Sequence, residues 1–199
     1  MRFFFQIDRE RFIVGRGILR AILGLYLSSA PELLSFLYNS YGKPAMAGES
    51  GRDAIHFNVS HSNGSALYAF TRGREVGVDL EHVRDDLEVD LIATQFFSPR
   101  EIAALRALPA EQRKYGFFNC WTRKEAYIKA KGEGLSLPLD QFDVSLNPGE
   151  PAALLATRPD SHEAQRWSLQ ELTFGIGYAA ALAVAGRIGS LSCFQFRLS

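Results

Sequence analysis

The sequence predicts an α+β fold in which two similar halves, each combining a helix with strands, meet near Gly73-Arg74. The order of the expected elements supports this fold, because a helical segment followed by strands occurs twice along the chain. A length of 199 residues suffices for one large domain or two small ones. Hydrophobic residues make up 47% and charged residues 22%, which is an ordinary globular composition.

The first half is expected to contain one long helix and several short strands. Phe12, Leu19, Leu23 and Tyr26 recur at helical spacing and predict a helix over residues 9–28, which ends near Pro31. Turn chemistry at residues 41–44 and a loop over residues 48–53 interrupt the segment after this helix. Strands are expected over residues 35–38, 55–59, 66–71 and 76–80.

The second half begins with helices and returns to strands. Ser98-Pro99-Arg100-Glu101 has the cap, the proline and the glutamate that are typical of a helix start. The longest helix is expected over residues 111–131, where Gly132 and Gly134 end it. Residues 87–96 are also predicted to be helical. The expected strands cover residues 142–146, 166–172, 178–184 and 191–196.

The bulk properties exclude several classes of protein. Lys plus Arg and Asp plus Glu both number 22, so the chain lacks the basic excess of a nucleic-acid binder. No apolar run reaches the length of a membrane span, and the apolar run of residues 1–5 is too short for a signal sequence. Cys120 and Cys193 are interpreted as reduced core residues of a cytoplasmic protein.

Asp79 and Glu81, in the segment Gly77-Val78-Asp79-Leu80-Glu81, are the first candidates for chemistry. They lie two positions apart on a predicted strand, so their side chains leave the same face. Two adjacent carboxylates repel each other unless a proton or a cation lies between them, and a hard divalent cation is a natural partner. The alternative is a solvated polar face at the end of a strand.

Glu125 and Lys129 are the second pair of candidates. They lie four positions apart on the longest predicted helix and therefore share a face. A surface ion pair is the alternative interpretation. Trp121 and Ile128, however, place Glu125 beside an apolar stripe, which favours a carboxylate held for metal binding.

The segment Ser60-His61-Ser62 follows a predicted strand and precedes a turn at Gly64. These side chains could donate hydrogen bonds to a phosphate group. A merely structural turn is the alternative. A Ser-His hydrolase is disfavoured, because the G-x-S-x-G elbow is absent and adjacent residues on a strand point to opposite faces.

These candidates belong to a larger set of motifs that occur in a fixed order. The set comprises Tyr41-Gly42-Lys43-Pro44, Phe57-Asn58-Val59-Ser60-His61-Ser62, Gly77-Val78-Asp79-Leu80-Glu81, Phe96-Phe97-Ser98, the segment from Trp121 to Lys129, and Gly132-Glu133-Gly134-Leu135-Ser136. Together they resemble the motifs of surfactin-type 4′-phosphopantetheinyl transferases. The resemblance extends from about Phe3 to Ala185, and the ordered combination is far more specific than any single motif.

The resemblance implies a role for each matching position. Asp79, Glu81 and Glu125 would be ligands of Mg²⁺, and Glu125 and Lys129 would be the catalytic residues. Lys129 would also contact the pyrophosphate of coenzyme A. The other implied residues for binding coenzyme A are Lys43, Ser60 and His61. Lys124 matches the motif as well, but helical geometry turns it away from Glu125.

The resemblance also implies an architecture and a reaction. Two subdomains, residues 1–74 and 75–199, would pack as an intramolecular pseudo-dimer with the site in the cleft between them. The N-terminal part is expected to be shortened, since family members usually have further residues before the segment that matches Phe3-Phe4-Phe5. The reaction would transfer the 4′-phosphopantetheine moiety of coenzyme A to a serine of a carrier protein and release adenosine 3′,5′-bisphosphate. The protein would act as a monomer without nucleic acid or membrane.

Two other functions stay open on sequence alone. One is a different Mg²⁺-dependent nucleotide transferase or hydrolase on the same scaffold. The other is a non-catalytic module that binds coenzyme A or a carrier protein. Acyl carriers of fatty-acid synthases and the carriers of polyketide and nonribosomal peptide synthases all remain candidate partners.

Overall fold

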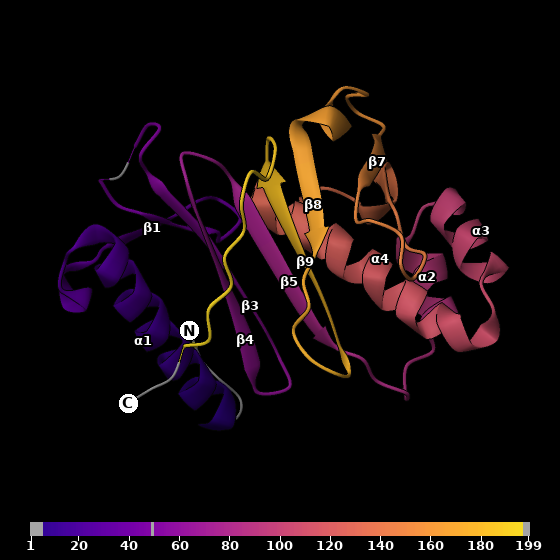
Figure 1. Ribbon diagram of the computed structural model, residues 1–199, viewed down its shortest axis with the longest axis horizontal. Helices are drawn as coiled ribbons and strands as arrows, with labels where there is room; N and C mark the ends of the chain where they lie inside the picture. The colour runs from indigo at the N-terminus through magenta and orange to yellow at the C-terminus, as the bar shows by residue number, and fades with distance from the viewer. Residues whose placement is uncertain (1–5, 49, 197–199) are drawn as a thin grey trace.

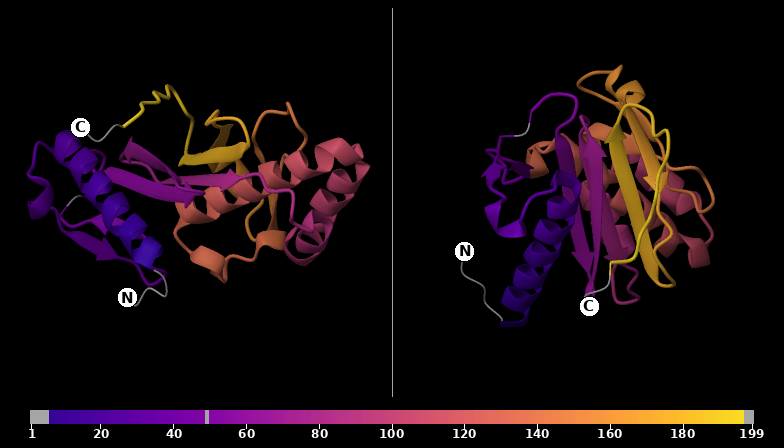
Figure 2. Two further views of the ribbon diagram at one scale, coloured as in Figure 1. Left: turned by 90° about the horizontal axis from the view of Figure 1, so that it is seen from below. Right: turned by 60° about the vertical axis from the view of Figure 1, so that its left-hand side comes forward.

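A computed structural model describes residues 6–48 and 50–196 of the chain. The molecule is elongated, with helix α1 (Gln6–Leu27) at one end and helices α2 (Val89–Phe96) and α3 (Pro99–Ala107) at the other (Figures 1 and 2). The apolar run of residues 1–5 and position 49 of the predicted loop lie outside the described residues. No helix in the described part of the chain is long and apolar enough to cross a membrane.

The N-terminal half is a helix packed on a hairpin. Strands β3 (Ile55–Ser62) and β4 (Ser65–Arg72) pair antiparallel, and a smaller hairpin joins β1 (Phe36–Tyr38) to β2 (Pro44–Met46). Leu19 and Leu23 of α1 pack against Phe57 of β3 in a small core. Helix α1 therefore covers one face of the β3–β4 hairpin (Figure 1).

The C-terminal half is built on a three-stranded antiparallel sheet. Its strand order is β5 (Val76–His82), β9 (Tyr178–Ala185), β8 (Trp167–Glu171). The long helix α4 (Ala110–Lys131) lies across this sheet and contributes to the largest core of the molecule (Figure 1). Strands β6 (Phe142–Val144) and β7 (Leu154–Thr157) form a further hairpin beside it.

A glycine allows α4 to approach the strand that carries the predicted metal ligands. A Cβ atom at Gly77 would lie 2.1 Å from the Ala126 carbonyl oxygen and 2.3 Å from the Ala130 nitrogen, so a side chain is excluded there. Asp79 and Glu81 follow Gly77 at alternate positions and therefore share its face of β5. The close contact thus brings the last turns of α4 over the acidic side chains.

The two halves are joined along β3 and β5 by side chains, not by a backbone ladder. Asn58, Ser60 and Ser62 of β3 accept hydrogen bonds from the backbone N–H groups of Val78, Leu80 and His82, at 2.9, 3.1 and 3.0 Å. Buried backbone donors need partners, and an edge strand such as β5 would otherwise leave these donors unpaired. The alternating polar residues of β3 therefore form a regular seam between the halves.

Most of the predicted elements are confirmed, with two kinds of difference. The predicted strand over residues 191–196 is wrong: these residues form no strand, and Phe194 is 88% exposed. Its β-forming residues lack a partner strand, and a strand is stabilised by pairing more than by its own propensity. Strands β2 and β7 were not predicted; β2 begins at Pro44, which the sequence analysis assigned to a turn. Cys120 is buried as expected, whereas Cys193 is exposed and not part of the core.

Candidate active site

The predicted acids and Lys129 meet where β3, β5 and α4 come together. Lys129 Nζ donates to Asp79 Oδ1 at 2.5 Å and to Ser60 Oγ at 3.1 Å. Ser60 Oγ in turn donates to Asp79 Oδ1 at 2.9 Å. One residue from each of three elements thus forms a closed triangle of polar contacts.

Asp79 is buried but only half satisfied. Its side chain is 4% exposed, and its contacts with Ser60 and Lys129 both go to Oδ1. Oδ2 is buried and has no hydrogen-bond partner among the described residues. A buried carboxylate oxygen without a partner is costly, so this atom marks a position where a missing group would be stabilising.

Glu81 lies one pleat further along β5 and has its own partner on β3. Ser62 Oγ donates to Glu81 Oε2 at 3.1 Å while accepting from the His82 backbone. Burial and the negative charge of Asp79 raise the pKa of Glu81, and the Ser62 hydrogen bond acts in the opposite direction. The Ser62–Glu81 contact was not predicted from the sequence, although the polar alternation Asn58, Ser60, Ser62 on a buried strand is a usable signal for it.

Glu125 faces the same cluster from α4. Burial raises its pKa, the charges of Asp79 and Glu81 raise it further, and Lys129 lowers it. The structure brings Ser60, Asp79 and Lys129 of the predicted set into direct contact. Glu81 lies two positions after Asp79 on the same face of β5, and Glu125 lies one turn before Lys129 on α4.

The donor set suits a hard divalent cation in chemistry, although the carboxylates are not arranged as a finished metal site. Asp and Glu oxygens are the ligands that Mg²⁺ prefers, and the partnerless Asp79 Oδ2 offers one of them. Within residues 6–48 and 50–196, however, no three His, Cys, Asp or Glu side chains are grouped closely enough to hold a metal ion. The positive charge that faces Asp79 in this structure is the Lys129 ammonium group.

Lys124 belongs to the same sequence motif as Glu125 but faces a different side of α4. Its ammonium group contacts Glu101 Oε2 at 2.8 Å and donates to the carbonyl oxygens of Leu139 and Phe142 at 2.7 and 2.6 Å. Glu101 is the last residue of the predicted helix start, and it completes the capping box with Ser98. Lys124 therefore points away from Glu125, as the helical geometry indicated, and its burial was not predicted.

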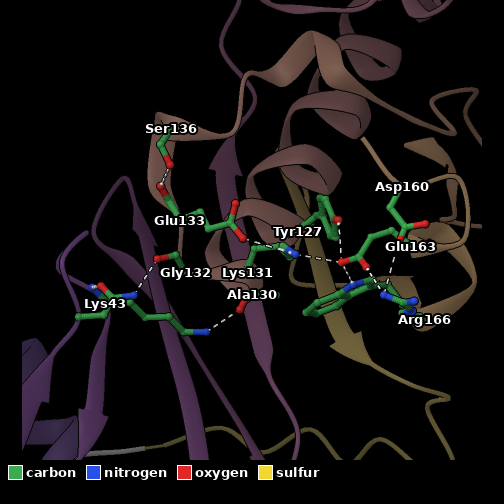
Figure 3. A network of polar contacts seen from close by, with 12 residues as sticks. Lys43, Tyr127, Ala130, Lys131, Gly132, Glu133, Ser136, Asp160, Glu163 and Arg166 are labelled. Carbon is green, nitrogen blue, oxygen red and sulfur yellow. Dashed lines mark hydrogen bonds and ion pairs between the residues drawn. The ribbon is translucent and has the colours of Figure 1, made fainter. Parts of the chain in front are cut away.

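Lys43 lies at the C-terminal end of α4 (Figure 3). Its ammonium group contacts Glu75 Oε2 at 2.6 Å and donates to the Ala130 carbonyl oxygen at 2.7 Å. The side chain is 16% exposed. The structure thus gives Lys43 protein partners at the seam between the halves.

His61 projects differently from its neighbour Ser60. Successive residues of a strand point to opposite faces, so His61 shares the face of Val59 and Phe57, which pack under α1. His61 itself is exposed near the end of β3. A ligand would have to extend over the end of the hairpin to contact both Ser60 and His61.

Comparison with known proteins places the chain in a family. Residues 75–183 match the model of the 4′-phosphopantetheinyl transferase superfamily. The 4′-phosphopantetheinyl transferase HetI of Nostoc sp. is 44% identical over 185 residues, which cover 93% of this chain and 75% of that protein. The 4′-phosphopantetheinyl transferase Sfp of Bacillus subtilis is 34% identical over 162 residues, covering 81% of this chain and 68% of that protein.

The solved structure of Thermotoga maritima holo-[acyl-carrier-protein] synthase aligns with 57% of this chain and 64% of that chain, at 20% identity and a TM-score of 0.45. The family match includes Asp79, Glu81, Glu125 and Lys129, and the relatives extend it across β3 and most of α1. The chain therefore belongs to the 4′-phosphopantetheinyl transferase superfamily, the enzymes that transfer the 4′-phosphopantetheine moiety of coenzyme A to carrier proteins.

Proposed function

We propose that this chain carries out the family reaction at the junction of β3, β5 and α4, with Mg²⁺ as its cofactor. The Oδ2 atom of buried Asp79, which has no hydrogen-bond partner in the described part of the chain, supports this proposal most directly. One oxygen of this carboxylate is paired with Lys129, and the other can accept a further positive partner. This arrangement suits a site that gains a cation when substrate binds.

The reaction is a phosphoryl transfer. The hydroxyl oxygen of a carrier serine forms a bond to the β-phosphorus of coenzyme A, and the bond from that phosphorus to the bridging oxygen breaks. The electron pair leaves with adenosine 3′,5′-bisphosphate, and the serine proton passes to a base. Such reactions depend mainly on positioning and on neutralising charge.

Glu125 is the proposed base. An ionised carboxylate can accept the serine proton, directly or through a water molecule. Without a bound cation, burial, followed by the charge of Asp79, raises the pKa of Glu125. Its position on α4, one turn before Lys129, puts the base and a cation on the same face of one helix.

Lys129 is proposed to stabilise the charge that develops on the leaving phosphate. Its side chain is 28% exposed, so it is partly open to solvent while it remains paired with Asp79. A charge already held in place costs little reorganisation during the reaction. Ser60 supports it from β3 through the 3.1 Å contact.

Asp79, Glu81 and Glu125 would hold the Mg²⁺ ion. When bound, the ion neutralises charge on pyrophosphate oxygens. The raised pKa values of Glu81 and Glu125 reflect burial and mutual repulsion, and a cation relieves the repulsion.

Coenzyme A is proposed to lie along the seam, with Ser60, His61, Lys43 and Lys129 as its contacts. Ser60 and Lys129 already adjoin each other. Lys43 would have to exchange its contact with Glu75 or with the Ala130 carbonyl for a phosphate. Residues 1–74 and 75–199 would then act as two subdomains that share one ligand.

The partner would be an acyl or peptidyl carrier protein of a fatty-acid, polyketide or nonribosomal peptide synthase. A monomeric enzyme is supported by the arrangement of the site, because the polar triangle is complete within one chain. Two free cysteines, one of them exposed, fit a reducing compartment such as the cytoplasm.

Mass spectrometry of apo-carriers incubated with the protein, coenzyme A and Mg²⁺ tests the proposal. The carrier should gain the mass of one phosphopantetheine arm. Asp79→Asn should lower the rate and recover partly at high Mg²⁺, because it weakens a metal ligand. Lys129→Ala should lower the rate without such recovery. If Mg²⁺ makes no difference to either variant or to the wild type, the metal assignment is wrong.

A further inference from the structure

The turn that carries Asn39 makes an unusually complete set of contacts. Asn39 Oδ1 accepts from the backbone N–H groups of Tyr41 and Lys43 at 3.0 and 2.9 Å, which closes the turn. Asn39 Nδ2 donates to the Gly132 carbonyl oxygen at 2.7 Å. One amide side chain thus shapes its own turn and reaches across to the other half of the molecule.

The target of this contact is the C-terminal end of α4. The last carbonyl groups of a helix have no partner within the helix and must find one elsewhere. Asn39 supplies a partner for the carbonyl group of Gly132. Lys43 supplies one for the carbonyl group of Ala130, at 2.7 Å (Figure 3). The positive charge of Lys43 also suits the negative end of the helix dipole.

The fit between the turn and the helix end is close. Gly132 ends α4 with φ +72°, a conformation that favours glycine. A Cβ atom at Gly132 would lie 2.8 Å from Lys43 Cδ and 3.2 Å from Asn39 Nδ2. The absence of a side chain at this position is therefore a condition for the turn to contact the helix.

This contact lies directly beyond Lys129. Ala130 and Gly132 are one and three positions after Lys129, so the carbonyl groups held by the turn belong to the turn of helix that carries this side chain. Gly77 fixes the same part of α4 from the side of β5, through Ala126 and Ala130. The end of the helix is thus held between a strand of its own half and a turn of the other half.

We infer that Asn39 is a positioning residue that sets the location of Lys129 by capping the C-terminal end of α4 from the N-terminal half. The inference rests on the proposed function, in which Lys129 stabilises the leaving phosphate. Asn39 contacts neither Asp79 nor the reacting groups; its effect is transmitted through the backbone of residues 129–132.

Asn39→Asp is the direct test. The variant keeps the oxygen that accepts from Tyr41 and Lys43, but it replaces the donor with a carboxylate oxygen that repels the Gly132 carbonyl. Asn119→Asp is the matched control, since Asn119 lies on α4 itself and also donates through Nδ2 to a backbone carbonyl, that of Leu146, at 3.3 Å. We expect Asn39→Asp to lower kcat about ten- to hundredfold, and Asn119→Asp to change it less than about twofold.

Amide hydrogen exchange provides a second readout that needs no activity. Asn39→Asp should speed the exchange of the amides of residues 129–132, while Asn119→Asp should leave them protected. Gly132→Ala should have the same effect as Asn39→Asp, because the added methyl group on the helix would push the Asn39 turn away from it. Unchanged exchange in both Asn39→Asp and Gly132→Ala would overturn the inference.

A double-mutant cycle with Lys129→Ala separates the inference from the proposed function. If Asn39 acts through Lys129, Asn39→Asp should cost less than about twofold in the Lys129→Ala background. An equal loss of kcat in both backgrounds would overturn the inference while leaving the role of Lys129 intact. Wild-type turnover in Lys129→Ala alone would instead refute the proposed function.

Discussion

Two of the lysine–carboxylate pairs on helix α4 differ in burial and in how fully their polar atoms are paired. Lys124 pairs with Glu101, with side chains that are 0% and 2% exposed. Lys129 pairs with Asp79, with side chains that are 28% and 4% exposed. The two lysines are five positions apart and lie on different sides of the same helix.

The difference lies in how completely each pair is satisfied. Lys124 donates to two carbonyl oxygens besides Glu101 and lies 4.2 Å from the centre of the Phe142 ring. Both Glu101 oxygens also accept backbone N–H groups, from Ser98 and Val144. The Lys129 pair, in contrast, leaves Asp79 Oδ2 without a partner among the described residues. A saturated pair stabilises the fold, whereas an unsaturated pair retains the capacity to bind.

The largest expected effect is on the saturated pair. Lys124→Met removes one partner of a fully buried ion pair, which typically costs about 3–5 kcal/mol of unfolding free energy. Urea denaturation measures this loss. The double variant Lys124→Met, Glu101→Leu should recover much of it, because no uncompensated charge remains buried. A loss below about 1 kcal/mol in Lys124→Met would show that the pair is not structural.

The second expected effect concerns the unsaturated pair and is on the rate of carrier modification. Lys129→Ala should lower carrier modification by about 10²–10³, which corresponds to roughly 3–4 kcal/mol of transition-state stabilisation. Its loss of unfolding free energy should be smaller than that of Lys124→Met, because Lys129 is partly exposed and water can replace it. If the stability loss of Lys129→Ala instead matched that of Lys124→Met, the contrast between the pairs would fail.

The sequence predicts this contrast only in part. Helical periodicity correctly turns Lys124 away from Glu125, and strand alternation correctly puts Asp79 and Glu81 on one face. Both arguments use local geometry, which a sequence contains. The partner of Lys124 could not be identified, because Glu101 comes from a different helix and the pairing depends on how α3 packs against α4.

Long-range packing also accounts for the differences at the candidate site. The role of Lys43 in holding coenzyme A stays a prediction, but its contact with the Ala130 carbonyl at the end of α4 spans 87 positions of sequence and was not predicted. The seam of Asn58, Ser60 and Ser62 depends on β3 lying beside β5 without a backbone ladder. Strand propensity gives no indication of such an arrangement.

The smallest expected effect is on the free energy of unfolding, and it comes from Glu125, one helical turn before Lys129 of the unsaturated pair. Burial, followed by the charge of Asp79, raises the pKa of Glu125 above its ordinary value of 4.5. Below that value the carboxyl group is neutral in both the folded and the unfolded chain, so it does not make the free energy of unfolding depend on pH. As the pH rises through 4.5, the unfolded chain ionises first, so the folded state loses stability until its own raised pKa is passed.

Glu125→Gln removes this penalty, so the variant should be more stable than the wild type at pH 7 in the absence of divalent cations. A gain of about 1 kcal/mol would raise Tm by about 2–4 °C in a chain of this size. The advantage should disappear near pH 4, where the wild-type carboxyl group is protonated. Glu111→Gln, an exposed position on the same helix, is the control and should show no comparable pH-dependent gain.

Adding Mg²⁺ sharpens this last comparison. A cation that binds only the folded state stabilises it by mass action. The wild type should therefore gain more from Mg²⁺ than Glu125→Gln does, and the stability difference seen in chelator should shrink or reverse. Thermal denaturation curves of both proteins, recorded in chelator and in Mg²⁺ at pH 4 and pH 7, measure the effect. Parallel pH profiles for the two proteins would show that Glu125 carries no electrostatic penalty and that the cluster is not poised to receive a cation.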